Sequence, residues 1–443
     1  SIKIADATLS VDQEREFQLA FLQYIVPDLM TPRLAVLYGN LVAFTLPLLI
    51  GEVNPIDLLL LTGLKALHPK IHEHLRQFSS LYTGDLGWDF SGNEDRGQFT
   101  YNALEGLLKD GDPMVATRVR HLLIHLFPQL RDVFQKKKYG EGSSSSLKNQ
   151  RVSSPEYLRR YLSFSVGGDD VSDKELAEFL TRLATSDQET VTAAFQPLVV
   201  APKTKMALRK LHDRTHDLAP EAARNLALAI STSGDFFPIG DDELFSSQDF
   251  AAQIVRDCLK QLEPAKRLET AETIVRSGRP IFFSLRCLDR MRAQRGEFQG
   301  ENLFPMEEIE SLLKVFADRV EEATQSDTPL LVGPPHSYGR LLFVWQESIG
   351  PERVRKYTNE CVAKDLDLLV SLISLGHSFF RTGNDAMDQE GYETISKICD
   401  TDALAAAVSR WLASREDTEP APAVIESFMK IHKKSKDTPS ELA

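Results

Sequence analysis

The sequence contains few cysteines and no excess of positive charge. Its four cysteines lie far apart among 443 residues, with no CxxC pair, which excludes a zinc knuckle and a dense disulfide framework. The net charge of −13 disfavours general binding to nucleic acid phosphates or anionic lipid. The opening residues SIKIADATLS lack the basic segment and apolar core of a secretory signal. We therefore expect a cytoplasmic protein, and the start at Ser1 rather than Met indicates a piece of a longer one.

The motifs of two large enzyme classes are also missing. No G-x-x-x-x-G-K-[ST] phosphate loop occurs, because GPPHSYGR at 333–340 lacks a Lys-Ser/Thr pair at the start of a helix. GHSFF at 376–380 lacks the second glycine of a nucleophile elbow. We therefore assign no catalytic residue and expect no ATP hydrolysis by this chain alone.

Long uncharged stretches are scarce, and the main exception runs from Thr31 to Leu61. Its apolar part, Leu34 to Ile50, spans seventeen residues, contains Pro47 and ends at a Gly-Glu pair. A helix that crosses a bilayer needs about 20 apolar residues. We therefore expect a buried helix of a water-soluble core rather than a membrane span.

Helix-start signals divide this stretch into two packed helices. Thr31 is a good N-cap with Pro32 at the first helical position, and Asn54 followed by Pro55 repeats the pattern. Similar starts follow at Asp112-Pro113, Ser154-Pro155 and Ala219-Pro220, and capping boxes open at Ser172 and Ser186. The same signals thus recur well beyond the opening stretch.

Alternating patterns typical of strands are scarce. The best candidates, PLVV at 197–200 and PLLVG at 329–333, are too isolated to build a sheet. Apolar residues recur instead at helical spacing, as Leu176, Phe179 and Leu183 do. The sequence therefore predicts an all-α fold.

Two segments interrupt the helical pattern and define the predicted domains. Residues 136–151, KKKYGEGSSSSLKNQR, are basic and then rich in Gly and Ser, which is typical of a flexible linker. From Arg415 the sequence REDTEPAPA breaks the pattern again. The predicted divisions are residues 1–135, a linker at 136–154, a helical array at 155–414 and a partly disordered tail at 415–443.

Histidines occur in three i, i+4 pairs, a spacing that puts two imidazoles on one helix face. The pairs are His68/His72, His121/His125 and His212/His216. No third ligand is evident beside them, so no metal site is predicted.

A helical RNase remains an alternative, since an Arg and a His separated by four to six residues can act on a ribose hydroxyl. The candidate pairs are Arg120 with His125 and Arg209 with His216.

Two long motifs resemble a known family. The first, residues 31–84, has a TPR-led helix, then GEVNPIDLL and a His-Pro turn. The second joins FPQL at 127–130 to RVSSPEYLRRYLSFSVGGDDVSDKELAEFL at 151–180. In this order and spacing the motifs resemble the segment that follows the nucleotide-binding core in the KAP family of P-loop NTPases.

The resemblance implies a lid-like helical segment followed by an irregular multi-helix array. Arg33, in the TPR helix, would sense the terminal phosphate of a nucleotide. A complete parent protein would bind ATP and Mg²⁺ through an N-terminal P-loop NTPase core upstream of Ser1, because the phosphate loop and acidic strand are absent here.

The later helices would then be a regulatory region that reads an unknown protein partner, and the family implies a link with antiviral defence. Homo-oligomer formation and membrane attachment of the parent stay open. The alternatives are the RNase-like effector and a purely structural protein-interaction scaffold.

Overall fold

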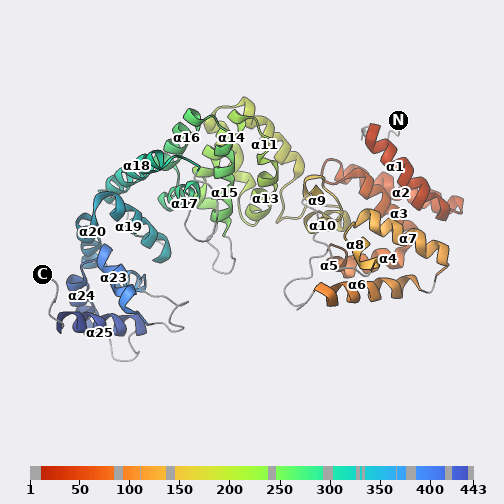
Figure 1. Cartoon of the computed structure of the whole chain (residues 1–443). Helices are drawn as coiled ribbons and strands as arrows, with labels where there is room; N and C mark the ends of the chain where they lie inside the picture. Colours follow the sequence, from red (N-terminus) through yellow and green to blue (C-terminus); the bar gives the residue numbers. More distant parts are fainter. Residues whose placement is uncertain are drawn as a thin grey trace. The chain divides into compact units, whose positions relative to one another are not determined.

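The fold of the computed structural model is all-α, as predicted (Figure 1). The structure describes residues 11–83, 93–109, 111–135, 145–237, 246–292, 303–325, 330–331, 335–365, 367–375, 386–414 and 422–437. Within these ranges it has 24 α-helices, three short 3₁₀ helices and no strand. Of the two strand candidates, 197–200 overlaps the 3₁₀ helix η2 and 329–333 lies mostly outside the described residues.

The chain divides into two units. Unit 1 comprises Ser1–Ser186 and Ala194–Leu218, and unit 2 comprises Asp187–Ala193 and Ala219–Ala443. The helices of unit 1 are α1 (Val11–Tyr24), η1 (Val26–Asp28), α2 (Pro32–Leu49), α3 (Pro55–Leu67), α4 (Pro69–Gln77), α5 (Ser79–Thr83), α6 (Asn93–Leu108), α7 (Pro113–Leu126), α8 (Leu130–Phe134), α9 (Ser145–Lys148), α10 (Pro155–Ser163), α11 (Asp173–Thr185), η2 (Gln196–Leu198) and α13 (Thr204–Thr215). Helix α12 (Gln188–Phe195) begins in unit 2 and ends in unit 1.

Unit 2 is a succession of helices, most of which pack against a neighbour in the chain. They are α14 (Pro220–Ser231), η3 (Gly234–Phe236), α15 (Ser247–Lys260), α16 (Pro264–Ser277), α17 (Ile281–Met291), α18 (Met306–Thr324), α19 (Pro335–Ile349), α20 (Pro351–Lys364), α21 (Asp367–Ser374), α23 (Gln389–Ile398), α24 (Thr401–Ser414) and α25 (Ala423–Asp437). Helix α23, by contrast, packs against α19, α20 and α25. Packing pairs such as α14 with α15, α16 with α18 and α19 with α20 make this unit the irregular multi-helix array that the sequence predicts.

Helix α3 is the centre of unit 1 and packs against α1, α2, α4 and α7. It begins where the sequence predicts, because the Oδ1 atom of Asn54 accepts the backbone N–H groups of Ile56 and Asp57 at 3.0 and 3.2 Å. Every residue from Ile56 to Leu64 is buried. An apolar helix surrounded by other helices explains the leucine-rich sequence of this segment.

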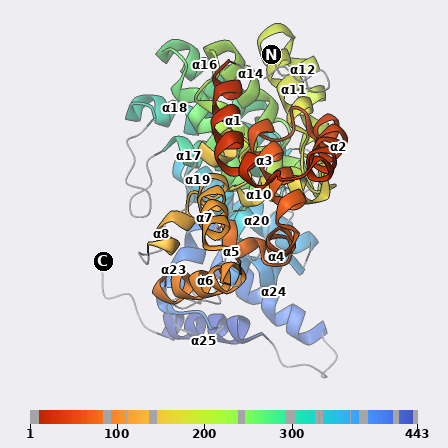
Figure 2. The same cartoon turned by 90° about the vertical axis from the view of Figure 1, so that its right-hand side faces the viewer.

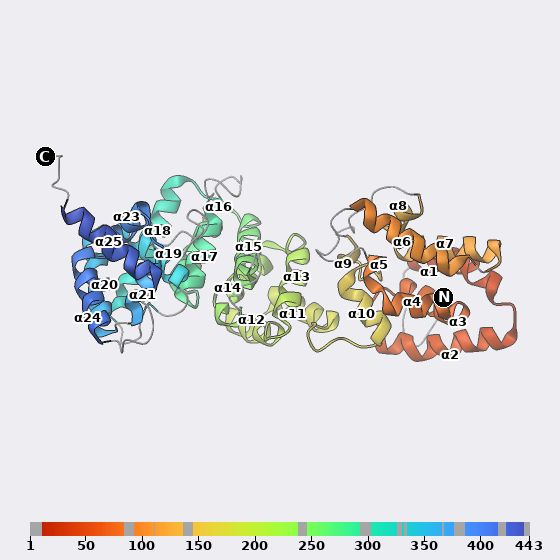
Figure 3. The same cartoon turned by 90° about the horizontal axis from the view of Figure 1, so that it is seen from below.

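Helix α2 packs on α3 along one side only, which corrects the expectation of a buried helix. Figures 2 and 3 show it at the edge of unit 1, with α3 beside it. Its buried residues are Tyr38, Val42, Thr45, Leu46 and Leu49. By length and composition α2 is also the one described helix that could cross a membrane. The sequence shows that the helix is apolar, but not which of its sides is covered.

Most of the predicted helix caps are confirmed by hydrogen bonds. Thr31 accepts the N–H of Leu34, Asp112 that of Met114 and Ser172 that of Glu175. The cap of α12 differs by one residue from the predicted Ser186, because Asp187 accepts the N–H of Thr190 at 2.9 Å. Local capping rules thus locate helix starts to within one residue here.

The division between the units does not lie at the predicted linker. Residues 155–186 and 194–218 belong to unit 1 together with the N-terminal helices. Of the predicted linker, 136–144 lies outside the described residues, whereas Leu147 and Val152 are buried in the core of unit 1. The Gly/Ser-rich composition therefore marks an interruption within one unit rather than a boundary between two domains.

Part of the predicted tail is a packed helix. Helix α25 buries Val424, Ile425 and Phe428 within unit 2, and residues 415–421 and 438–443 lie outside the described residues. These apolar side chains at i, i+1 and i+4 form one face. This apolar face is short and is followed by mostly polar residues after Lys430, so it is difficult to recognise from the sequence.

Candidate functional site

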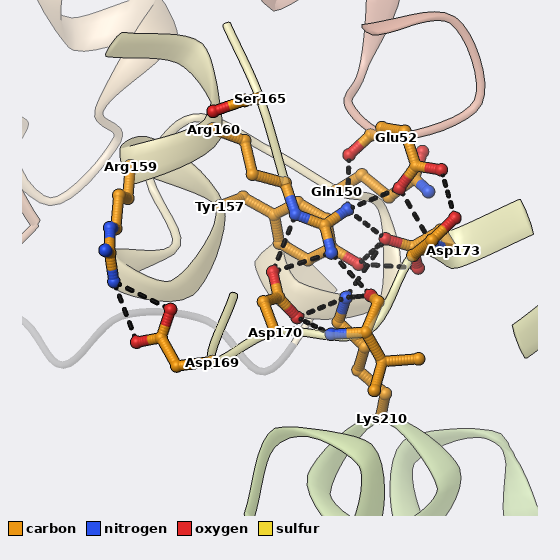
Figure 4. A network of polar contacts seen from close by, with 12 residues as sticks. Glu52, Gln150, Tyr157, Arg159, Arg160, Ser165, Asp169, Asp170, Asp173 and Lys210 are labelled. Carbon is orange, nitrogen blue, oxygen red and sulfur yellow. Dashed lines mark hydrogen bonds and ion pairs between the residues drawn. The ribbon is translucent and has the colours of Figure 1, made fainter. Parts of the chain in front are cut away.

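The two sequence motifs meet at a buried arginine in unit 1 (Figure 4). Arg160 on α10 is 1% exposed and binds three carboxylates. Its Nε donates to Asp170 Oδ2 at 2.7 Å, and its Nη1 donates to Glu52 Oε2 at 2.9 Å and to Asp173 Oδ2 at 2.5 Å. Glu52 belongs to the turn between α2 and α3, so one guanidinium joins residues more than 100 positions apart in the sequence.

Lys210 on α13 provides the second buried cation of this cluster. Its ammonium lies 3.0 Å from Asp170 Oδ1 and 3.1 Å from Asp173 Oδ2, and donates to the carbonyl of Val171 at 2.8 Å. The ring of Tyr157 lies against both cations, 5.0 Å from Lys210 and 4.9 Å from Arg160. Four segments of unit 1 are therefore held together by one set of polar contacts.

The charges of this cluster are nearly balanced. Three carboxylates face Arg160 and Lys210, and Arg214 adds a partly exposed cation 3.6 Å from Asp173. Burial alone would lower the pKa of Arg160, but the nearby carboxylates outweigh it and raise that pKa. Burial, then Asp173, raises the pKa of Tyr157, whose neutral hydroxyl donates to Asp173 at 2.8 Å. These ion pairs join side chains of α10, α11 and α13 and so hold these helices in position.

Glu52 also caps a helix other than its own. The first two N–H groups of α11, those of Asp173 and Lys174, donate to its carboxylate at 2.8 and 3.4 Å, and the hydroxyl of Ser172 donates to it as well. A carboxylate at a helix N-terminus satisfies unpaired N–H groups and matches the helix dipole. Gly51, with φ +74°, turns the chain so that Glu52 can reach α11. The Gly-Glu-Val-Asn-Pro sequence predicts a helix end and a helix start at this turn, but not the contact with α11.

A second buried carboxylate ties α3 to the residues before α10. Asp57 is fully buried, and its Oδ2 accepts Arg151 Nε at 2.8 Å and the N–H of Val152 at 2.9 Å. Its Oδ1 is buried and has no hydrogen-bond partner among the described residues. Burial outweighs Arg151 and raises the pKa of Asp57 to about 6.

The raised pKa of Asp57 predicts a pH-dependent stability. A carboxyl that binds its proton more tightly when folded stabilises the fold at low pH, and this contribution is lost as pH rises through the folded pKa. The rise from 3.8 to about 6 corresponds to about 3 kcal/mol. We expect the free energy of unfolding of the unsubstituted chain to fall by up to that amount between pH 4 and 7, relative to that of the Asp57→Asn variant. Urea denaturation of both proteins measures it, and parallel pH curves would contradict it.

Arg33, the predicted nucleotide-phosphate sensor, is exposed in the first turn of α2. The acidic residues that precede and follow it in the sequence have other partners: Asp28 pairs with Arg118 and His68, and Glu52 pairs with Arg160. Arg33 forms no ion pair or hydrogen bond with any residue that the structure describes. Its guanidinium is therefore available to a ligand or a partner.

Both arginines of the RNase alternative are paired with glutamates. On α7, Arg120 binds Glu105 at 2.6 Å, and the Nε2 of His125 lies 3.9 Å from Glu16. On α13, Arg209 pairs with Glu156, and His216 is exposed just after the end of this helix.

The three histidine pairs form no metal centre in the described parts of the chain, where no group of three or more His, Cys, Asp or Glu side chains is arranged to hold an ion. His68 pairs instead with Asp28 at 3.1 Å, and His72 is buried.

We found no match to the chain among family models, curated proteins or solved structures. The likeness to KAP NTPases therefore rests on the sequence motifs.

Proposed function

We propose that this chain is the helical regulatory part of a KAP-type P-loop NTPase and that α2 docks on the nucleotide-binding core. The observation that carries the proposal is the exposed, uncharged side of α2. Val36, Phe44 and Leu48 on this helix are 61%, 64% and 51% exposed. Their spacing of eight and four residues aligns them in one stripe. Contiguous exposed apolar surface of this kind marks an interaction site.

Small residues lie beside this stripe. Ala35, Gly39 and Ala43 follow one another at intervals of four and are exposed, so the backbone of α2 is accessible to close approach. No charged residue occurs between Arg33 and Glu52. The surface therefore favours a second apolar surface of protein rather than a charged partner.

The other side of α2 argues against burial of the whole helix in lipid. Tyr38, Val42 and Leu46 pack on the core of unit 1, and the Tyr38 hydroxyl donates to the carbonyl of Leu59 at 3.3 Å. Burial of α2 in lipid would break these contacts and expose the core of unit 1. We therefore propose that α2 docks on protein rather than crossing a membrane.

Arg33 lies at the N-terminal end of the same helix and is free of protein partners in the described part of the chain. An arginine fork suits the terminal phosphate of a nucleotide held by a docked core. ATP and Mg²⁺ would belong to that core, since this chain has no phosphate loop.

The cluster around Arg160 offers a route from α2 to α11 within unit 1. Movement of α2 would displace the turn that carries Glu52, and Glu52 contacts both Arg160 and the start of α11. The later helices would read an unknown protein partner. Antiviral defence is proposed from the family resemblance alone.

The first test is the coding sequence immediately upstream. The proposal requires a G-x-x-x-x-G-K-[ST] loop followed by an acidic apolar strand there. An upstream region without both motifs would rule out the nucleotide switch and leave the structural scaffold.

In the longer protein, we expect Arg33→Ala to lower ATP turnover at saturating nucleotide by at least about 10-fold, since it removes a charged contact to the transferred phosphate.

The docking itself is tested with two glycine substitutions. A Cβ added at Gly39 on α2 or at Gly106 on α6 meets no atom within 4 Å, so the fold accommodates a larger side chain at both positions. We expect Gly39→Trp to weaken binding of this chain to the separately produced core by at least about 10-fold, because it holds the two surfaces apart. Gly106→Trp is the matched control and should bind normally. Equal effects of the two variants would contradict docking through α2.

A further inference from the structure

A recess of about 400 Å³ lies in unit 1 where α1 ends, α7 ends and α8 begins. The residues that line it are Gln23, Tyr24, His121, Ile124, His125, Arg131 and Gln135. All but Ile124 carry N–H or O–H donors, and none is a carboxylate. In a chain of net charge −13, such a composition favours an anionic ligand.

Two other recesses of unit 1 lack this property. In one of them, Arg76 and Arg159 are each paired with a carboxylate, of Glu73 and Asp169 respectively. The other contains Glu16 beside its basic residues. Positive charge is therefore neutralised by the protein in these two recesses, but not at Arg131.

Arg131 and His121 are available to a ligand, because neither has an ion pair among the described residues and both are exposed. His125 is half-buried, and its Nε2 lies 3.9 Å from the carboxylate of Glu16. Burial, then Arg151, lowers the pKa of His125, and Glu16 opposes this shift. Burial raises the pKa of Tyr24, so its hydroxyl stays a neutral donor.

We propose that this recess binds the phosphate group of a small phosphorylated molecule. The Arg131 fork supplies a charge-assisted contact, and the imidazoles of His121 and His125 supply further donors. Ile124 and the ring of Tyr24, whose centroid is 5.8 Å from that of His125, form the apolar wall for the rest of the molecule. The volume lies within the range of small-ligand pockets. No cleavage of the ligand is involved.

Inorganic phosphate is the probe that tests this site. Titration of the full chain with phosphate at constant ionic strength, followed by NMR of the histidine side chains, should give saturable shifts at His121 and His125. The imidazole pKa values of both should rise, because a bound dianion stabilises the charged forms. Arg131→Gln should weaken phosphate binding by about 10-fold or more, the usual cost of a lost charged hydrogen bond.

The control is Arg159→Gln, which removes an exposed arginine of another recess and should leave phosphate binding unchanged. His121→Asn, also at an exposed position, provides a second variant of the site if Arg131→Gln does not fold. Shifts that fail to saturate, that chloride reproduces, or that persist unchanged in the folded variants of the recess would overturn the proposal. None of these outcomes affects docking through α2, which Gly39→Trp tests separately.

Discussion

Replacement of Arg160 by methionine is expected to destabilise unit 1 by about 3–5 kcal/mol. Methionine fills much of the same space but leaves Glu52, Asp170 and Asp173 buried without their shared cation. Lys210 and the partly exposed Arg214 cannot neutralise three carboxylates that lie at most 11% exposed. The loss of stability comes from uncompensated buried charge rather than from lost packing. Removal of one partner therefore destabilises the fold by more than the ion pairs contribute in net stabilisation.

The neighbouring arginine provides the control for this experiment. Arg159 is 67% exposed and pairs with Asp169, which is 53% exposed. An ion pair in water contributes less than about 1 kcal/mol, so Arg159→Met should be nearly neutral. Urea denaturation gives the two free energies, and hydrogen exchange at the first amides of α11 shows whether the cap from Glu52 is lost with Arg160. Similar stabilities for the two variants would show that the cluster does not hold unit 1 together.

The features that the sequence predicted are those set by neighbouring residues. Asn54 caps α3 because the two N–H groups that donate to its Oδ1 lie within three positions of it, and Pro55 fixes the first helical residue. The all-α fold follows from such starts repeated along the chain. These signals need no knowledge of what the helix packs against.

The contacts of Glu52 could not be predicted in the same way. Its partners, Arg160 and the N-terminus of α11, lie 108 to 122 positions later in the sequence. The one available signal was an acidic residue at the end of an otherwise uncharged run, which requires a partner or exposure to water. Composition identifies that requirement but not the residue that satisfies it.

Exposure and domain limits depend on tertiary packing too. Helix α2 is apolar on both sides, so its sequence does not reveal that Phe44 faces solvent while Leu46 is buried. Residues 147–154 follow a Gly/Ser run, yet Val152 is buried, and its N–H donates to the carboxylate of Asp57. The composition of this segment therefore does not show at which residue the chain begins to pack on the rest of unit 1.

The C-terminal helix gives the second large expected effect. Phe428 on α25 is fully buried in unit 2. Its ring lies 5.6 Å from that of Tyr392 and stacks 6.0 Å from that of His432. The Tyr392 hydroxyl and His432 Nδ1 are hydrogen-bonded at 2.8 Å. An integral helix, rather than a disordered tail, accounts for this aromatic cluster.

Phe428→Ala should therefore destabilise unit 2 by about 3–5 kcal/mol, since it removes a buried ring and leaves a cavity against Tyr392. The matched control on the same helix is Lys433→Ala, an exposed position where a change within about 0.5 kcal/mol is expected. Hydrogen exchange of α23 and α25 separates this loss from the unfolding of unit 1. In a disordered tail the ring would already be in water, and both substitutions would leave the exchange of α23 unchanged. Faster exchange of α23 in Phe428→Ala alone is the result that the packed helix requires.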